Sequence, residues 1–186
     1  MKSIINSYTK FLLHGLFFLP LLISAQEINW ITMDEAARLQ KQYPKKIIID
    51  MYTTWCGPCR MLDRNTFSNK SLAEYVNANF YAVKFNAEGT EEIYYNDFNY
   101  TNPNHNPERK GRNSQHLFAH ALNINAYPSL VFFDEGGEVI TPIAGYKSPT
   151  DLEIYLKMVS NDDYKRLTTK DAWTEYQANF ENTFTN

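Results

Sequence analysis

The sequence predicts an α/β fold, in which a central sheet is flanked by helices, from three observations. The apolar run 47–52 contains three consecutive isoleucines, which is typical of a strand that is covered on both faces. Strand-like and helix-like segments follow one another along the chain, as in folds that pack helices on a sheet. The glycine pair 136–137 separates two strand-like runs and indicates a hairpin. With 186 residues, 44% of them hydrophobic, the chain can form one domain with a full core.

Local signals assign the elements in order. Thr32 and Glu35 match a capping box at the start of a first helix. A helix is also expected from Arg60, and Thr66–Ser68 is expected to break it, with Ser68 as the cap of a further helix. The later elements expected are a strand over 80–85, a helix around 117–122, strands over 129–133 and 139–141 with an edge at Pro142, a helix that opens at Ser148-Pro149, and a last helix with Trp173, Tyr176 and Phe180 on one face.

Residues 88–113 differ in composition from the rest of the chain. They hold six asparagines, two prolines and four aromatic residues between Tyr94 and Tyr100. A long irregular loop inside a compact domain is usually functional or disordered. The aromatic residues favour a packed loop, and we expect part of it to lie near the functional face.

The first 25 residues resemble a secretory signal peptide. Lys2 and Lys10 supply positive charge, residues 11–23 are mostly apolar, and Ser24-Ala25 offers small residues for cleavage before Gln26. An uncleaved interfacial anchor is the alternative interpretation. We therefore expect three segments: a signal peptide over 1–25, the main domain over 26–162 with its insertion at about 88–113, and a C-terminal helical extension over 163–186. The expected location is periplasmic or secreted.

Composition argues against several classes of function. The net charge of −3 argues against a nucleic-acid partner. The two cysteines cannot form a disulfide framework, and a zinc site needs four ligands, whereas the chain has no second C-x-x-C. His116 and His120 have a metal-ligand spacing, but a solvated or half-buried pair is the better interpretation. No metal or other cofactor is predicted.

Both cysteines lie in Trp55-Cys56-Gly57-Pro58-Cys59, between the strand at 47–52 and a helix. The N–H groups at a helix start favour negative charge, so Cys56 is the candidate nucleophilic thiolate. We expect Cys56 to be exposed and Cys59 to face inward. Gly57 and Pro58 keep the turn tight, and Trp55 either shields the nucleophile or simply packs. A static structural disulfide is the alternative.

Asp50 is out of place in its apolar strand. A buried carboxylate without a partner is unfavourable and has a raised pKa. The alternative is a carboxylate at the strand end, in contact with solvent, because strand boundaries inferred from sequence are uncertain by about 2–4 residues.

The order of elements and the W-C-G-P-C motif resemble the thioredoxin family over residues 30–160. The resemblance implies the thioredoxin fold, with a mixed sheet, here with a long insertion before the cis-proline segment and an extra C-terminal helix. Thr66-Phe67-Ser68 is more similar to exported, periplasmic-type members. Two departures are the long insertion and Arg64, which stands where thioredoxins usually have a proline.

The resemblance also implies roles. Cys56 and Cys59 would form the redox-active disulfide, with Cys59 as the resolving thiol and Asp50 as its proton acceptor. Tyr127-Pro128 resembles the family's cis-proline segment, which binds extended substrates together with Trp55, Gly57 and Pro58; an ordinary trans turn is the alternative. Expected partners are proteins with thiols or disulfides and a membrane electron donor, and we expect a monomer.

The sequence therefore predicts a thiol-disulfide oxidoreductase that reduces protein disulfides outside the cytoplasm and serves redox homeostasis. Within the same class, an oxidase or isomerase remains open, because motifs do not set the redox potential. In another class, the scaffold could be a binding module whose insertion docks a partner.

Overall fold

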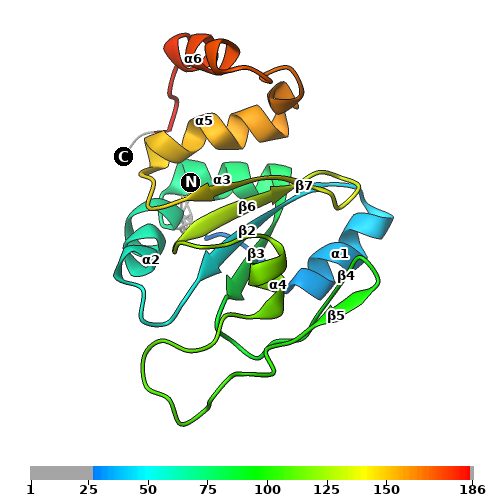
Figure 1. Cartoon of the computed structure of the whole chain (residues 1–186). Helices are drawn as coiled ribbons and strands as arrows, with labels where there is room; N and C mark the ends of the chain where they lie inside the picture. Colours follow the sequence, from blue (N-terminus) through cyan, green and yellow to red (C-terminus); the bar gives the residue numbers. More distant parts are fainter. Residues whose placement is uncertain (1–26, 185–186) are drawn as a thin grey trace, which may run out of the picture.

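The structure is a computed structural model that describes residues 27–184, so the predicted signal peptide lies outside the described residues. Five strands form one sheet in the order β1-β3-β2-β6-β7 (Figure 1). The pairs β1–β3 and β2–β3 are parallel, whereas β2–β6 and β6–β7 are antiparallel, which confirms the predicted mixed sheet. The strands are β1 (Trp30–Ile31), β2 (Lys46–Tyr52), β3 (Phe80–Asn86), β6 (Ser129–Phe133) and β7 (Val139–Ala144).

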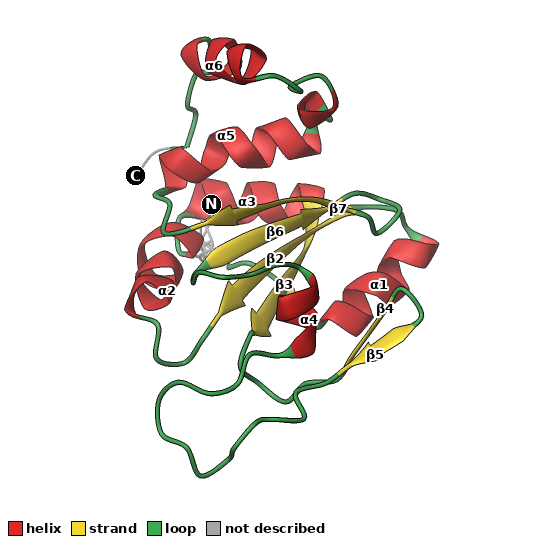
Figure 2. Ribbon diagram, in the orientation of Figure 1, coloured by secondary structure: helices red, strands yellow, loops and turns green. Residues whose placement is uncertain are grey.

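Helices cover both faces of this sheet (Figure 2). One face carries α1 (Met33–Gln42) and α4 (Leu117–Ala121), and the other carries α2 (Gly57–Leu62), α3 (Lys70–Asn79) and α5 (Pro149–Ser160). Successive side chains of a strand point to opposite faces, so Ile47 and Ile49 pack under α1 and α4, whereas Ile48 packs under α2, α3 and α5. The isoleucine run is therefore covered on both faces, as predicted.

The hairpin and the edge strand also follow the prediction. Gly137 has a φ of +87° in the turn between β6 and β7, a conformation that glycine adopts without steric cost. Pro142 lies in β7 at the edge of the sheet, where a missing N–H costs no ladder bond to a further strand.

After the cysteine motif, the predicted break between two helical stretches is present, but it falls at Ser68 and Asn69, and the cap differs from the prediction. α2 continues into a π-helical turn, η1 (Asp63–Phe67), and α3 is capped by Asn69, whose Oδ1 accepts from Leu72 N at 3.0 Å. Ser68 has helical backbone angles and donates its hydroxyl to Arg64 O at 2.6 Å. An N-cap needs an extended backbone, which Asn69 has and Ser68 lacks.

The first helix confirms its cap only in part. Thr32 Oγ1 accepts from Glu35 N at 3.2 Å, as a capping box requires. The Glu35 carboxylate pairs instead with Arg38 at 2.6 Å.

The insertion is less irregular than predicted. It contains a short hairpin of β4 (Ile93–Tyr95) and β5 (Phe98–Tyr100), with positive φ at the two turn residues between them. Tyr95 and Tyr100 pack against Phe118 of α4, whereas Tyr94 and Phe98 are 57% and 52% exposed. Half of the aromatic residues therefore attach the insertion to the domain. Strands this short leave no clear alternation in a sequence.

Beyond α5 the chain forms a 3-10 turn, η2 (Asp163–Lys165), and α6 (Lys170–Ala178), and then returns along α5 (Figure 1). Trp173 and Tyr176 stack at 5.9 Å on one face, as predicted, with Phe180 just beyond the helix end. Within residues 27–184, none of the helices combines the length and the apolar character that a membrane span requires.

Candidate active site

The two cysteines lie where β2 leads into α2. Cys56 is the N-cap of α2, and its Sγ accepts a hydrogen bond from Cys59 N at 3.1 Å. The sulfurs are joined in a disulfide, with an S–S distance of 2.07 Å. Both cysteines are 2% exposed, so the expected exposure of Cys56 is wrong for this oxidised form. The bond to Cys59 holds the Cys56 sulfur at the start of the helix instead of leaving it in solvent.

Asp50 lies on the face of the sheet that α2 covers. It is two residues after Ile48 in β2, so the two side chains share a face, and Ile48 packs in the same cluster as Leu62 of α2. Cys59 and Leu62 are the buried positions of α2 and lie three residues apart, on one side of the helix. Cys59 therefore faces the side of the sheet that carries Asp50.

Asp50 is 1% exposed, which excludes the solvent-facing alternative. Lys84 of β3 lies opposite it in the parallel register, with Nζ 3.3 Å from Asp50 Oδ2. Within the described part of the chain, neither carboxylate oxygen accepts a well-formed hydrogen bond. Burial raises the pKa of Asp50 to about 6, a rise that the charge of Lys84 opposes and the charge of Asp63 reinforces.

Lys84 forms ion pairs with two carboxylates. Its Nζ contacts Asp63 of η1 as well as Asp50, and it lies about 5 Å from the ring centroids of Trp30 and Tyr52. A pocket of about 450 Å³ is lined in part by Lys84 and Asp63, but Asp50 does not line it. Lys84 and Asp63 thus stand between the buried carboxyl and a solvent-accessible space.

The peptide bond Tyr127-Pro128 is cis, as predicted, and leads directly into β6. Pro128 is buried and its carbonyl accepts from Gly145 N at 2.8 Å. The Tyr127 ring contacts Trp55 edge to face at 6.2 Å between centroids. The cis-proline segment and the cysteine motif are therefore neighbours, although the contacting residues Trp55 and Tyr127 lie 72 positions apart in the sequence.

Trp55 is held by residues that the sequence analysis did not single out. Its Nε1 donates to Glu88 Oε2 at 2.8 Å, and the same oxygen accepts from Asn113 N at 2.8 Å. The Arg112 guanidinium carbon lies 4.3 Å from the centroid of the Trp55 ring. Both ends of the insertion therefore meet at Trp55. A glutamate at the start of an asparagine-rich loop carries no signal for this contact.

The asparagines explain how the insertion keeps its shape without regular structure. Asn102 Nδ2 donates to Gly89 O and Ser114 O, which ties the two arms together. The Asn113 side chain donates through Nδ2 to Asn106 O at 2.8 Å and accepts at Oδ1 from Asn106 N at 3.0 Å, which closes the turn between them. Backbone groups that lack a ladder partner are satisfied by side-chain amides here.

The two histidines do not act as the predicted half-buried or solvated pair. His116 is fully buried at the start of α4, where Nδ1 accepts from Phe118 N and Nε2 lies 2.7 Å from Glu91 O. Burial lowers the pKa of His116. His120 is exposed. Across residues 27–184, no group of three or more His, Cys, Asp or Glu side chains is placed to bind a metal ion.

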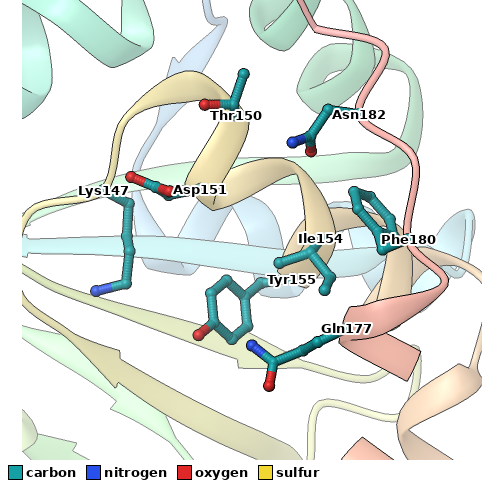
Figure 3. A pocket seen from close by; sticks show the side chains of 8 residues that line it. All are labelled: Lys147, Thr150, Asp151, Ile154, Tyr155, Gln177, Phe180 and Asn182. Carbon is teal, nitrogen blue, oxygen red and sulfur yellow. The ribbon is translucent and has the colours of Figure 1, made fainter. Parts of the chain in front are cut away.

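A separate pocket of about 360 Å³ lies between α5 and the segment around the end of α6, where Tyr155, Gln177 and Phe180 line it (Figure 3). None of the predicted site residues lines this pocket. It is therefore not part of the cysteine site.

Comparisons with known proteins identify the family and the fold. The profile of the family described as "Thioredoxin-like domain" matches residues 33–160. Thioredoxin-1 of Drosophila melanogaster is 32% identical over 60 residues, which are 32% of this chain; the match spans about half of that relative, 53% of its length.

Two solved structures show the same fold. A thioredoxin-fold protein from Helicobacter pylori has a TM-score of 0.56 at 15% identity, over 84% of this chain and 87% of that chain. A proposed disulphide-isomerase from Bacteroides thetaiotaomicron has a TM-score of 0.52 at 25% identity, over 73% of this chain and 94% of that chain.

Proposed function

Because this chain belongs to the thioredoxin-like domain family, we propose that its cysteine pair reduces disulfides in other proteins. The fold and the Cys56–Cys59 pair at disulfide distance are those of a thiol-disulfide oxidoreductase. The observation that carries the proposal is the position of this pair at the start of α2, where Cys59 faces the side of the sheet with the buried Asp50 and Trp55 contacts Tyr127. A binding module would not need a cysteine pair and a buried carboxylate together.

In the proposed reaction, the Cys56 thiolate attacks one sulfur of a substrate disulfide and expels the other as a thiolate. Cys59 loses its proton to Asp50, and its thiolate attacks Cys56 Sγ. The mixed disulfide breaks, the second substrate sulfur leaves as a thiolate, and the Cys56–Cys59 disulfide forms. The substrate gains the two electrons that the pair loses, and protons from Asp50 and water complete its thiols. An external dithiol donor must return two electrons and two protons.

Asp50 is suited to the proton step by its pKa. A carboxyl with a pKa of about 6 is partly ionised near neutral pH, so it can accept a proton and release it again. The pocket beside Lys84 and Asp63 supports proton exchange with solvent.

Reduction of insulin by dithiothreitol, with catalytic amounts of the protein, tests the proposal. We expect the wild-type chain to accelerate precipitation of the insulin B chain. Cys56→Ser should lose the activity by at least about 100-fold, because no nucleophile remains. Cys59→Ser should retain a substrate as a mixed disulfide on Cys56, visible by mass spectrometry, and Cys56→Ser is its matched control. Failure of the wild-type protein to accelerate reduction would refute the proposal.

An isomerase is the second candidate, and the 25% identity to the Bacteroides thetaiotaomicron protein supports it. The redox potential separates the two. The redox potential of a reductase should be about −270 mV and that of an isomerase about −180 mV. Equilibration with glutathione distinguishes these two values.

We also propose that the protein acts outside the cytoplasm as a monomer and receives electrons from a membrane donor. The apolar segment over residues 11–23 and the resemblance to exported family members support this location. Mass spectrometry of the chain made in an exporting bacterium should give Gln26 as its first residue.

A further inference from the structure

The turn between Asn106 and Asn113 carries three exposed cations, Arg109, Lys110 and Arg112. Within residues 27–184, none of the three forms a salt bridge, although the chain as a whole is acidic, with a net charge of −3. The turn also holds one acidic residue, Glu108. Three positive charges and one negative charge give the turn a net charge of +2. We call these three residues the basic turn.

The basic turn is fixed beside the cysteine motif. Glu88 accepts hydrogen bonds from Trp55 Nε1 and from Asn113 N, both at 2.8 Å, so one carboxylate joins the motif to the end of the turn. The Arg112 guanidinium then lies over the Trp55 ring, at 4.3 Å. Figure 1 shows the loop beside the chain that leads from β2 into α2.

A fourth cation adds to the same surface. Arg60 of α2 is exposed, and its Nη1 donates to Thr54 O at 3.1 Å. Arg60 and Arg112 therefore contact the two residues that precede Cys56. Glu88, which is 9% exposed, keeps its negative charge at this surface, because both of its hydrogen-bond donors are neutral. Four cations set against Glu88 and Glu108 leave a net charge of +2 beside the motif.

Three of the five acidic residues of the insertion lie away from the basic turn. Glu91, Glu92 and Asp97 lie in or next to the β4–β5 hairpin, which packs beside α1, whereas the basic turn lies at the motif. A surface with net positive charge beside a reactive group attracts anionic ligands to that group, even in a protein that is acidic overall. The reactive group is a disulfide, which exchanges with thiols, so the ligand must carry sulfur.

We propose that the basic turn and Arg60 select substrates whose cysteines lie in acidic protein segments. The inference rests on the proposed function and narrows its substrate class. Glutamate and aspartate side chains of the substrate pair with Arg109, Lys110 and Arg112, while the substrate sulfur meets Cys56. Attraction between opposite charges raises the rate of encounter, and salt lowers it.

Two symmetrical disulfide-linked peptides test this proposal; they are identical except that one carries glutamates and the other lysines around its cysteine. The reduced protein is mixed with each peptide in excess, and Trp fluorescence follows its oxidation. Each turnover consumes one peptide disulfide and yields two peptide thiols and the Cys56–Cys59 disulfide. Both peptides react with the same Cys56 thiolate, so the ratio of their rate constants cancels changes in the reactivity of that thiolate.

We expect the acidic peptide to react about tenfold faster at low salt, and the ratio to fall toward one at about 500 mM salt. Arg112→Glu should lower the ratio several-fold, and Arg109→Glu with Lys110→Glu should lower it further, whereas Arg112→Lys should preserve it. The matched control is Lys170→Glu, the same charge change on the exposed start of α6, which should leave the ratio unchanged.

A wild-type ratio near one, or a preference for the lysine peptide, would overturn the proposal. So would a preference that the three charge reversals leave intact, because another surface would then cause it. In both cases reaction with the peptides would still uphold the disulfide chemistry. If neither peptide reacts and insulin reduction also fails, the proposed function and this inference fall together.

Discussion

Two carboxylates in this protein are equally buried and differently bonded. Asp50 in β2 is 1% exposed, and Glu153 in α5 is 0% exposed. The Glu153 oxygens accept hydrogen bonds from Thr183 N, Thr183 Oγ1 and Phe184 N, at 2.6 to 2.9 Å, and lie 2.6 Å from Lys157 Nζ. Asp50 has Lys84 at 3.3 Å as its counter-ion.

The difference shows how a fold assigns one chemical group to two tasks. Burial alone would raise the pKa of Glu153, but its bonds to Lys157, Thr183 and Phe184 outweigh burial and lower that pKa. At Asp50 burial prevails, and its pKa rises to about 6. Glu153 is thus ionised throughout the neutral range and holds the C-terminal segment on α5, whereas Asp50 can exchange a proton.

Glu153→Gln should give the largest effect. The amide keeps the shape but loses the charge, and its NH₂ group faces donors instead of acceptors, so we expect a loss of about 3–5 kcal/mol in the free energy of unfolding at pH 7. Because the folded-state pKa of Glu153 is lowered, its stabilisation is present above pH 4.5 and is lost as the pH falls through that lower pKa. Urea denaturation at pH 7 and pH 3 measures the loss and its decline in acid.

Glu175→Gln is the matched control, because Glu175 is an exposed residue of α6, and it should leave the free energy of unfolding unchanged. Equal losses of unfolding free energy in the two variants would show that Glu153 does not hold the C-terminal segment on α5.

Asp50→Asn should have the opposite effect and raise the free energy of unfolding. A pKa that rises from 3.8 to about 6 on folding corresponds to about 3 kcal/mol of destabilisation at neutral pH, at 1.36 kcal/mol per pKa unit. The sign follows from proton binding: the folded state keeps the proton to a higher pH, so the contribution of Asp50 to stability is most favourable below pH 3.8 and declines until about pH 6. The asparagine variant should therefore be more stable at pH 7 and show no gain below pH 3.8.

Urea denaturation across this pH range checks the gain, and thiol exchange should slow in the same variant. A less stable variant at pH 7 would mean that the pair with Lys84 outweighs the cost of burial.

The sequence could predict the burial of Asp50 but not the environment that tunes it. Three isoleucines before Asp50 indicate a strand covered on both faces, and the C-x-x-C motif follows at once. Lys84 meets Asp50 only because β2 and β3 pair in one particular register, and local patterns do not encode a register between distant strands.

The bonding of Glu153 could not be predicted from the sequence for a related reason. Its partners Thr183 and Phe184 are about 30 residues away, and they meet it only because the chain returns along α5. Glu88 likewise joins Trp55 through a tertiary contact. Periodicity identifies which face of an element is buried, whereas a polar contact across the fold depends on how loops close.

We expect the smallest effect from Asp63→Asn. This variant tests whether the charges around Asp50 set its pKa, as the comparison with Glu153 implies. The charge of Asp63 raises the pKa of Asp50, and Asp63 also shares the Lys84 ammonium. Removing that charge should lower the pKa of Asp50, because Lys84 would then pair with Asp50 alone. The pH at which thiol exchange becomes half-maximal should therefore shift downward. Lys84→Met should shift it upward, because the charge of Lys84 lowers the pKa of Asp50.

Single-turnover rates of thiol exchange between pH 5 and pH 8 measure both shifts, with Asp50→Asn as the variant in which neither can occur. Asp63 is 44% exposed, so solvent weakens its field, and its shift should be the smaller of the two. Opposite shifts would show that two surface-accessible charges set the protonation of a carboxyl that solvent does not reach. Shifts that persist in the Asp50→Asn background would instead place the titration on the cysteines, and Asp50 would then be as purely structural as Glu153.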